Sequence, residues 1–149
     1  LEIAAVTRNS ETRLLINDRA DIAAAVGADG VHLTSISLRA AIVRKAFGNK
    51  MLIGVSAHSD ADVQYAAGGG ADFAVLGPVF ATPDKEQPIG VEKLRSICTS
   101  AGSFPVLALG GIDNSNFQSV IGAGATGFAA IRSLNDPVSM REILSQINS

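Results

Sequence analysis

The stretch "PVLALGGIDNSN", residues 105–116, decides the fold prediction. An apolar run ends at Gly110 and Gly111, and acidic and amide residues follow at once. A continuous apolar run of this length is typical of a strand buried on both faces, as in a parallel sheet. Glycine is a weak strand and helix residue, so the pair marks a turn. The stretch therefore predicts a buried strand that delivers polar residues to one edge of a sheet.

The same arrangement occurs six times along the chain. The apolar runs are "RLLIN" (13–17), "DGVHL" (29–33), "MLIGVS" (51–56), "DFAVLG" (72–77), "FPVLALG" (104–110) and "GFAAI" (127–131). Apolar residues at helical spacing lie between or after them: Ile22, Ala25 and Val26; Leu38, Ala41, Ile42 and Ala46; Val91, Leu94, Ile97 and Cys98; Met140, Ile143, Leu144 and Ile147. Strands that alternate with helices predict βαβ units in a single α/β domain, residues 1–149. Six units suit an open sheet or part of a (βα)8 barrel, since a complete barrel usually needs about 200 residues or more.

The composition bounds the function classes. The 149 residues are 47% hydrophobic and 17% charged, which is enough to bury a core. The net charge is −2 without a basic stripe, which argues against a nucleic-acid partner. No apolar run approaches the roughly 18 residues that span a membrane. The single cysteine and the lack of a signal pattern predict a cytoplasmic location, and the oligomeric state stays open, a homo-oligomer included.

Polar side chains gather where the predicted strands end. In either α/β architecture these ends converge on one face, which is where such proteins place their sites. The residues are Asn17, Asp18, His32, Ser56, His58, Thr82, Lys85 and Arg132. We therefore expect the functional site on this face.

Gly110 and Gly111 are candidates for phosphate binding. A strand, two glycines and a helix starting near Asn114 would expose backbone N–H groups beside a helix N-terminus, which favours an anion. The next strand end, near Ile131 and Arg132, would lie beside them, and the loops after the last two strands form the usual phosphate site of a (βα)8 barrel. A tight turn that uses glycine for geometry alone is the other interpretation.

The remaining strand ends also allow two interpretations each. Asp18 could bind Mg²⁺, which takes one or two carboxylates beside a phosphorylated ligand, or it could cap the following helix. His58 could transfer protons or be a surface histidine. Thr82 and Lys85 could clamp a phosphate or lie in a solvated loop. His32 lies closer to a strand interior and is interpreted as a hydrogen-bonded core histidine.

Taken in order, five segments resemble the thiamine-phosphate synthase/TenI family: "LLINDRADIAAAVGADGVHL", "IGVSAHS", "ADFAVLGPVFATPDK", "LALGGID" and "GATGFAAIRSL". The series covers nearly the whole chain. The resemblance implies a TIM-type (βα)8 barrel, of which this chain supplies the last six βα units. The first two units, with the family's Gln-x-Arg-x-Lys strand, are expected before residue 1, because six units alone leave open strand edges.

The resemblance also implies an activity and its cofactor. The family's synthases join a hydroxymethylpyrimidine pyrophosphate to a thiazole phosphate and release pyrophosphate, with Mg²⁺ bound. Asn17 matches the contact to the pyrimidine pyrophosphate, Asp18 matches a Mg²⁺ ligand, and Ser56 matches a pyrophosphate contact. The partners implied are thus two phosphorylated small molecules.

The second half of the chain carries the other implied roles. Thr82 and Lys85 match the loop that meets the pyrophosphate and the thiazole phosphate, where Lys85 and Mg²⁺ would stabilise the leaving group. Gly111, Ile131 and Arg132 match backbone donors to the thiazole phosphate, beside Gly110.

Three positions depart from the synthase pattern. Ser37 stands where the synthases have their second metal-binding Asp, Asp84 replaces a threonine, and Arg132 replaces a serine. TenI-type thiazole tautomerases also lack that Asp, and their catalytic histidine matches His58, which would transfer a proton without a metal.

The synthase is favoured over the tautomerase because the pyrophosphate and Mg²⁺ residues, Asp18 and Lys85 among them, are kept. The tautomerase and a non-catalytic thiazole-phosphate-binding protein are the alternatives.

Overall fold

The computed structural model describes residues 2–83 and 87–147, and within them six parallel strands form one sheet in the order β1-β2-β3-β4-β5-β6. The strands are β1 (Leu15–Asn17), β2 (Gly30–Leu33), β3 (Leu52–Ala57), β4 (Phe73–Leu76), β5 (Val106–Leu109) and β6 (Gly127–Ala129). The helices are α1 (Glu2–Thr7), α2 (Ala20–Val26), α3 (Ala40–Phe47), the 3₁₀ turn η1 (Gly48–Lys50), α4 (Asp60–Gly68), α5 (Gly90–Ala101), α6 (Phe117–Gly122), α7 (Arg132–Asn135) and α8 (Pro137–Ile147). All six predicted strands are confirmed.

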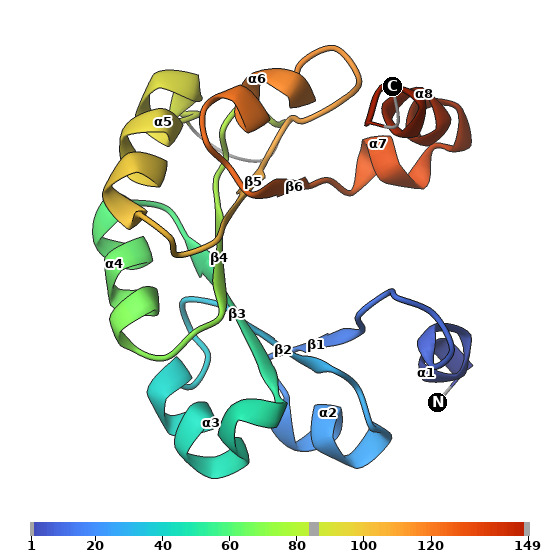
Figure 1. Ribbon diagram of the computed structural model, residues 1–149, viewed down its shortest axis with the longest axis vertical. Helices are drawn as coiled ribbons and strands as arrows, with labels where there is room; N and C mark the ends of the chain where they lie inside the picture. Colours follow the sequence, from blue (N-terminus) through green and yellow to red (C-terminus); the bar gives the residue numbers. More distant parts are fainter. Residues whose placement is uncertain (1, 84–86, 148–149) are drawn as a thin grey trace.

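The sheet curls into a half-barrel. Figure 1 shows the strands following a C-shaped path, with α3, α4 and α5 on the convex side and both termini on the open side. Within the described residues, β1 and β6 each pair with one neighbour only. The α/β architecture is therefore confirmed as a parallel half-barrel with two open strand edges.

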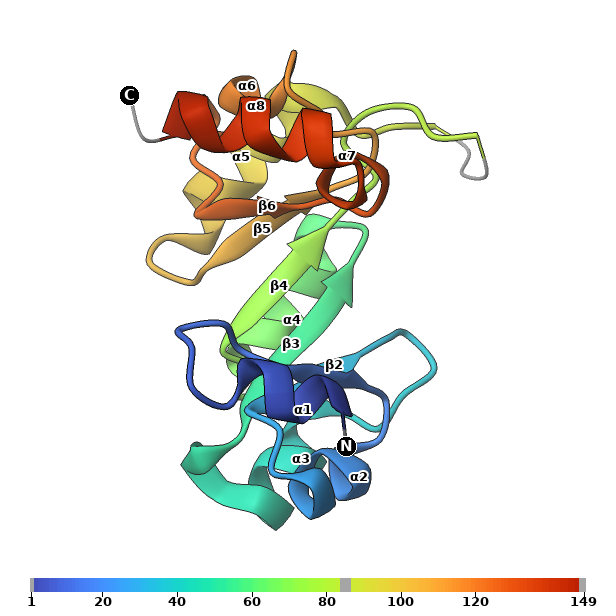
Figure 2. The same cartoon turned by 90° about the vertical axis from the view of Figure 1, so that its right-hand side faces the viewer.

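Two hydrophobic clusters lie between the sheet and the helices. The first comprises Ala20, Ala23, Val31, Leu33, Ala40, Val43, Met51 and Ile53. The second comprises Ala57, Val63, Ala74, Leu76, Val79, Leu94, Ile97, Cys98, Val106, Ala108, Ile112, Phe117, Val120, Ala123, Ala125 and Ile143. Figure 2 shows the two halves stacked one above the other, joined through β3 and β4. We call the part around the first cluster the N-terminal half and the part around the second the C-terminal half.

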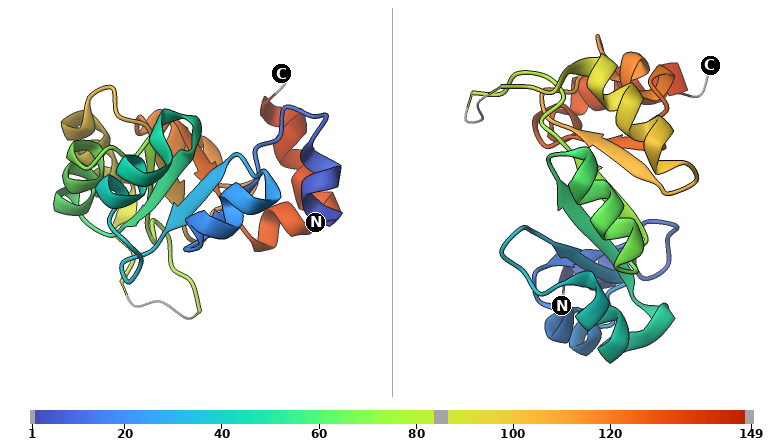
Figure 3. Two further views of the ribbon diagram at one scale, coloured as in Figure 1. Left: turned by 90° about the horizontal axis from the view of Figure 1, so that it is seen from below. Right: turned by 90° about the vertical axis from the view of Figure 1, so that its left-hand side faces the viewer.

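The apolar residues at helical spacing do not mark the buried faces of α2 and α3. Ile22, Leu38 and Ile42 are 39%, 60% and 51% exposed, whereas small residues such as Ala23 and the branched Val43 face the sheet. Small inward residues let a short helix approach the strands closely, and alanines on every side of α2 leave its rotation undetermined by spacing. On α5 the predicted face is right, and Figure 3 shows α4 and α5 side by side on the outer surface.

Strand alternation gives the sheet two chemically different faces. Val31, Leu33 and Ile53 point to the helices and belong to the first cluster. Because successive strand residues point to opposite faces, His32 and Ser56 point to the concave side. The parallel register places all strand carboxyl ends at one rim. No helix in the described part of the chain is long and apolar enough to span a membrane.

Candidate functional site

The end of β1 makes a tight turn at Asp18. Asp18 has φ +61, the left-handed conformation that Asp tolerates better than most residues. Its N–H donates to the His32 carbonyl at 2.9 Å, which ties the turn to β2. The N-cap of α2 is Arg19, with no side-chain cap hydrogen bond. Asp18 therefore does not cap the helix, and its carboxylate is held elsewhere.

The Asp18 carboxylate joins an oxygen cluster with the β2–α3 loop. Thr34 Oγ1 donates to Asp18 Oδ1 at 3.2 Å, and the Ser37 hydroxyl donates to the same oxygen. Ser37 Oγ in turn accepts the Thr34 N–H at 2.7 Å, so its own proton is free for Asp18. The Ser37 hydrogen bond is the main cause that lowers the pKa of Asp18 below its ordinary value. Asp18 is thus an ionised carboxylate flanked by two hydroxyls.

His32 and Ser56 form a second polar pair beside this cluster. His32 Nε2 lies 2.9 Å from Ser56 Oγ, across the β2–β3 ladder. Burial lowers the pKa of His32, and the nearby Asp18 carboxylate raises it in part. The interpretation of His32 as a hydrogen-bonded interior histidine is confirmed, and its partner is a predicted site residue.

His58 follows β3 and is anchored through both its backbone and its ring. Its N–H donates to Asp62 Oδ2 at 2.9 Å, the main cause that lowers the pKa of Asp62. Its ring Nδ1 lies 2.6 Å from the Gly77 carbonyl oxygen. A carbonyl only accepts, so Nδ1 carries the proton, and the lone pair of a neutral ring is then on Nε2. His58 is therefore an exposed residue whose imidazole is held by a hydrogen bond.

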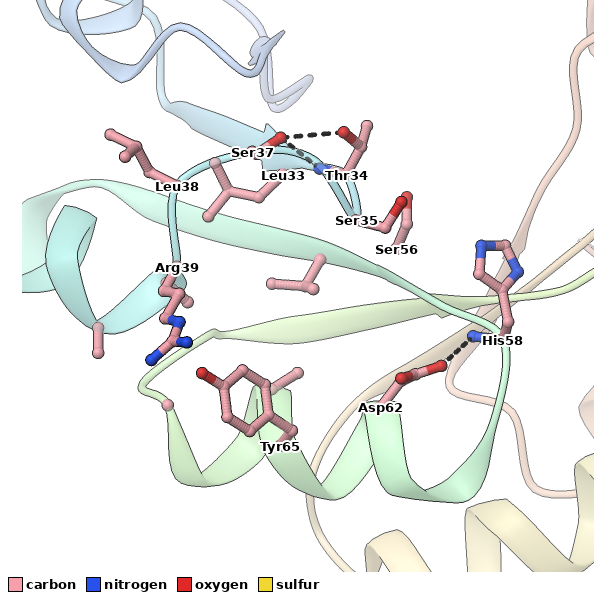
Figure 4. A pocket seen from close by; sticks show the side chains of 15 residues that line it. Leu33, Thr34, Ser35, Ser37, Leu38, Arg39, Ser56, His58, Asp62 and Tyr65 are labelled. Carbon is pink, nitrogen blue, oxygen red and sulfur yellow. Dashed lines mark hydrogen bonds between the residues drawn. The ribbon is translucent and has the colours of Figure 1, made fainter.

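A cavity of about 280 Å³ lies beside Ser56 and His58, and neither Asp18 nor His32 lines it. It is lined by the β2–α3 loop, the end of β3 and α4, including Thr34, Ser37, Ser56 and His58. Figure 4 shows the Thr34 and Ser37 hydroxyls facing each other and Asp62 bonded to the His58 backbone. The structure therefore brings four polar groups, from the β2–α3 loop and from the end of β3 with the residue after it, to one opening.

A second cavity, of about 400 Å³, lies at the ends of β4, β5 and β6. Five predicted residues line it: Thr82, Gly110, Gly111, Ile131 and Arg132. Thr82 Oγ1 is buried, and no hydrogen-bond partner for it exists among the described residues. A buried hydroxyl without a partner costs free energy.

Positions 110 and 111 require glycine for their backbone conformation and for the close approach of a neighbouring loop. Gly110 has φ +103 and Gly111 φ +63. A Cβ on Gly110 would lie 2.6 Å from Pro78 Cα, and one on Gly111 would lie 2.7 Å from the Ala81 carbonyl oxygen. The glycines therefore let the β4–α5 loop pack directly over the end of β5.

The helix predicted to start near Asn114 is entered through a turn, in which the Phe117 N–H donates to the Asp113 carbonyl at 3.1 Å. Residues 114–116 form a turn, and α6 begins only at Phe117. Asp113 Oδ1 accepts hydrogen bonds from the Ser115 N–H and hydroxyl, which holds this turn and lowers the pKa of Asp113. The short α7 instead begins at Arg132, directly after Ile131.

The other predicted site residues have different outcomes. Asn17 is exposed at the end of β1, in register with His32. Lys85 and Asp84 lie outside the described residues. The described residues contain no group of three or more His, Cys, Asp or Glu side chains that could hold a metal ion.

Sequence reasoning missed Thr34 and Pro78. Thr34 directly follows "VHL" and donates to Asp18, and Pro78 lines the second cavity with a cis peptide bond from Gly77. Their position one residue past a strand end was the available signal.

Comparisons with known proteins agree with this geometry. The model of the family described as thiamine monophosphate synthase matches residues 1–134. A thiamine-phosphate synthase of Chloroflexus aurantiacus is 43% identical over 134 residues, which are 88% of this chain and 61% of the relative. One of Gloeobacter violaceus is 43% identical over 136 residues, 90% of this chain and 40% of the relative.

Solved structures give the same result. A thiamine phosphate pyrophosphorylase from Pyrococcus furiosus has a TM-score of 0.86 and 29% identity, and the match covers 98% of this chain and 72% of that one. The chain spans about half the length of the curated relatives it matches. From the family model and these identities, the chain belongs to the thiamine monophosphate synthase family.

Proposed function

We propose that the chain carries most of the active site of a thiamine-phosphate synthase and supplies the last six βα units of its barrel. The reaction joins a hydroxymethylpyrimidine diphosphate to a thiazole phosphate. The thiazole nitrogen forms a bond to the pyrimidine's methylene carbon, the carbon–oxygen bond to the diphosphate breaks, and pyrophosphate leaves. A cytoplasmic location and a homo-oligomer stay predictions.

The single observation that carries the proposal is the buried Thr82 hydroxyl without a protein partner. Thr82 lines a cavity together with Gly110, Gly111, Ile131 and Arg132. A phosphate oxygen is an acceptor that would satisfy this hydroxyl. We assign this cavity to the thiazole phosphate, with Lys85 as a further cation from the same loop.

The N-terminal half would hold the diphosphate. Asn17 on β1 and Ser56 on β3 lie on the concave side on either side of β2, whose His32 carbonyl accepts the Asp18 N–H. Two hydroxyls and one carboxylate form an all-oxygen donor set, which suits a hard cation that takes its other ligands from water and from substrate phosphate. Asp18 would therefore hold Mg²⁺, which would neutralise charge on the departing pyrophosphate. The protein's own part is to orient the diphosphate and exclude water.

Pyrophosphate release by the full-length protein tests this function. With both substrates and Mg²⁺, we expect turnover that Asp18→Asn abolishes. Asp21→Asn is the matched control, because Asp21 lies three residues away and is paired with Arg19 on the exposed side of α2. The absence of turnover in the wild type with Mg²⁺, or an equal loss in both variants, would refute the synthase.

A thiazole tautomerase is the second candidate, favoured by the His58 ring geometry. With Nδ1–H held by the Gly77 carbonyl, Nε2 could accept a proton. Isomerisation of a thiazole carboxylate phosphate that continues in EDTA and stops in His58→Ala would support this activity. Binding of thiazole phosphate without product in either assay would instead indicate a non-catalytic binding protein.

A further inference from the structure

We propose that His32 is a positioning residue for Ser56: its Nε2–H donates to Ser56 Oγ and turns the serine's own proton toward a phosphate oxygen of the ligand. The inference rests on the proposed function, because it requires a diphosphate beside Ser56. It assigns a task to a residue that carries none in the synthase scheme above.

The sheet register places the two side chains together. His32 pairs with Gly54 on β3, and Ser56 lies two residues further along the same strand. Residues two apart share a face, so His32 and Ser56 both point to the concave side. The separation of 2.9 Å between Nε2 and Oγ is that of a hydrogen bond.

Gly54 leaves the space that the imidazole occupies. A Cβ at position 54 would lie 2.4 Å from the Phe73 ring and 3.0 Å from His32 Nδ1. The two rings therefore lie directly over the bare backbone of Gly54. With Nδ1 turned toward this backbone, Nε2 is the ring nitrogen that reaches Ser56.

The position of the imidazole proton determines which of His32 and Ser56 donates the hydrogen bond. A neutral imidazole has one N–H and one lone pair. Among the described residues Ser56 Oγ is the one hydrogen-bonding partner of the ring, on Nε2, and Nδ1 has none. A proton on Nε2 gives this contact a ring donor and leaves the lone pair on Nδ1. We place the proton there, which makes His32 the donor and Ser56 the acceptor.

The direction matters because phosphate oxygens only accept. A serine that accepts from His32 keeps its own O–H for the ligand. A serine that donated to His32 would present lone pairs to an anion and weaken its binding. His32 thus determines whether Ser56 attracts or repels a diphosphate.

Replacing His32 by Gln or by Asn separates the proposed hydrogen bond from a role in packing, because the two amides are of nearly equal size. The side-chain amide nitrogen of His32→Gln reaches about as far as Nε2, whereas that of His32→Asn reaches only as far as Nδ1. We expect the Kd of the full-length protein for inorganic pyrophosphate with Mg²⁺ to rise about tenfold in His32→Asn, as in Ser56→Ala, and to stay within about twofold in His32→Gln. The His32→Asn/Ser56→Ala double variant should bind no more weakly than Ser56→Ala alone.

Nitrogen-15 NMR reads the tautomer directly. In a His58→Gln background His32 is the remaining histidine of the printed sequence, and we expect its proton on Nε2. A proton on Nδ1 would overturn the proposal, as would additive losses in the double variant or equal losses in His32→Gln and His32→Asn. Wild-type protein that binds no pyrophosphate would refute the diphosphate site of the proposed function and this inference with it, whereas normal wild-type binding with independent losses would refute this inference alone.

Discussion

The two halves of the sheet support their site residues by different means. In the N-terminal half, side chains hold one another: Ser37 and Thr34 hold Asp18, and His32 contacts Ser56. In the C-terminal half, backbone packing shapes the cavity, with Gly110 and Gly111 against the loop from Pro78. One half can therefore be altered one hydrogen bond at a time, whereas the other depends on close approach of main chains.

This comparison predicts that stability falls most when a new side chain blocks the close approach of the two main chains in the C-terminal half. In Gly110→Ala the new Cβ would lie 2.6 Å from Pro78 at φ +103, so we expect the free energy of unfolding to fall by about 3 kcal/mol. Chemical denaturation measures the change. Gly68→Ala is the control, because a Cβ at this α4 position meets nothing within 4 Å and should stabilise by up to about 1 kcal/mol. Equal changes in the free energy of unfolding for Gly110→Ala and Gly68→Ala would contradict the idea that the C-terminal half depends on close main-chain packing.

Two arginines test whether the N-terminal half depends more on side-chain bonds. Arg44 bonds to Asp72 and to the carbonyls of Met51 and Gly70, and its side chain is 19% exposed. Arg44→Met should lower the free energy of unfolding by about 2 kcal/mol, because buried acceptors lose a charged donor.

Arg95 on α5 is the counterpart in the C-terminal half. Its side chain is 49% exposed and it bonds to the Gly122 carbonyl, so Arg95→Met should cost under about 1 kcal/mol by the same measurement. A larger loss at Arg95 than at Arg44 would contradict the comparison.

Thr82 should show opposite effects on stability and binding. Thr82→Val replaces a buried, unpartnered hydroxyl with a methyl group, so the free energy of unfolding should rise by about 1 kcal/mol while phosphate binding weakens. Ser133 is the contrast, since its hydroxyl donates to the Ile112 carbonyl at 2.8 Å. Ser133→Ala should therefore lower stability by about 1 kcal/mol. Thermal unfolding and phosphate titration together distinguish a ligand-facing hydroxyl from a structural one.

The smallest effect is expected at Ser37. Ser37→Ala removes the main cause of the lowered pKa of Asp18, so that pKa should move up toward 3.8. A carboxyl with a depressed folded-state pKa contributes stability above its unfolded pKa and loses it as the pH falls through the folded pKa. The variant should therefore lose less stability on acidification from about pH 5 to about pH 2.

NMR titration of the Asp18 carboxyl checks this prediction. Ser35→Ala is the control on the same loop, because none of the hydrogen bonds to Asp18 comes from Ser35 in the described structure. An unchanged pKa in Ser37→Ala would show that Thr34 alone holds the carboxylate.

The sequence predicts strands and strand ends well because burial and glycine turns act locally. The apolar runs predicted all six strands. The polar residues and glycines that follow those runs predicted that Thr82, Gly110 and Arg132 lie together at one cavity. Helix rotation was not predictable for α2 and α3, since their inward face is set by how closely the helix approaches the sheet. The turn over residues 114–116 delays the start of α6 to Phe117, because the Asp113 side chain bonds locally to Ser115.

The position of Ser37 on a loop has a consequence for how such proteins diverge. Ser37 belongs to neither hydrophobic cluster, whereas His32 and Ser56 are fixed by strand register. A single codon change at position 37 can therefore exchange a hydroxyl for a carboxylate beside Asp18 without disturbing the sheet. The oxygen groups beside Asp18 can therefore change while His32 and Ser56 stay in place.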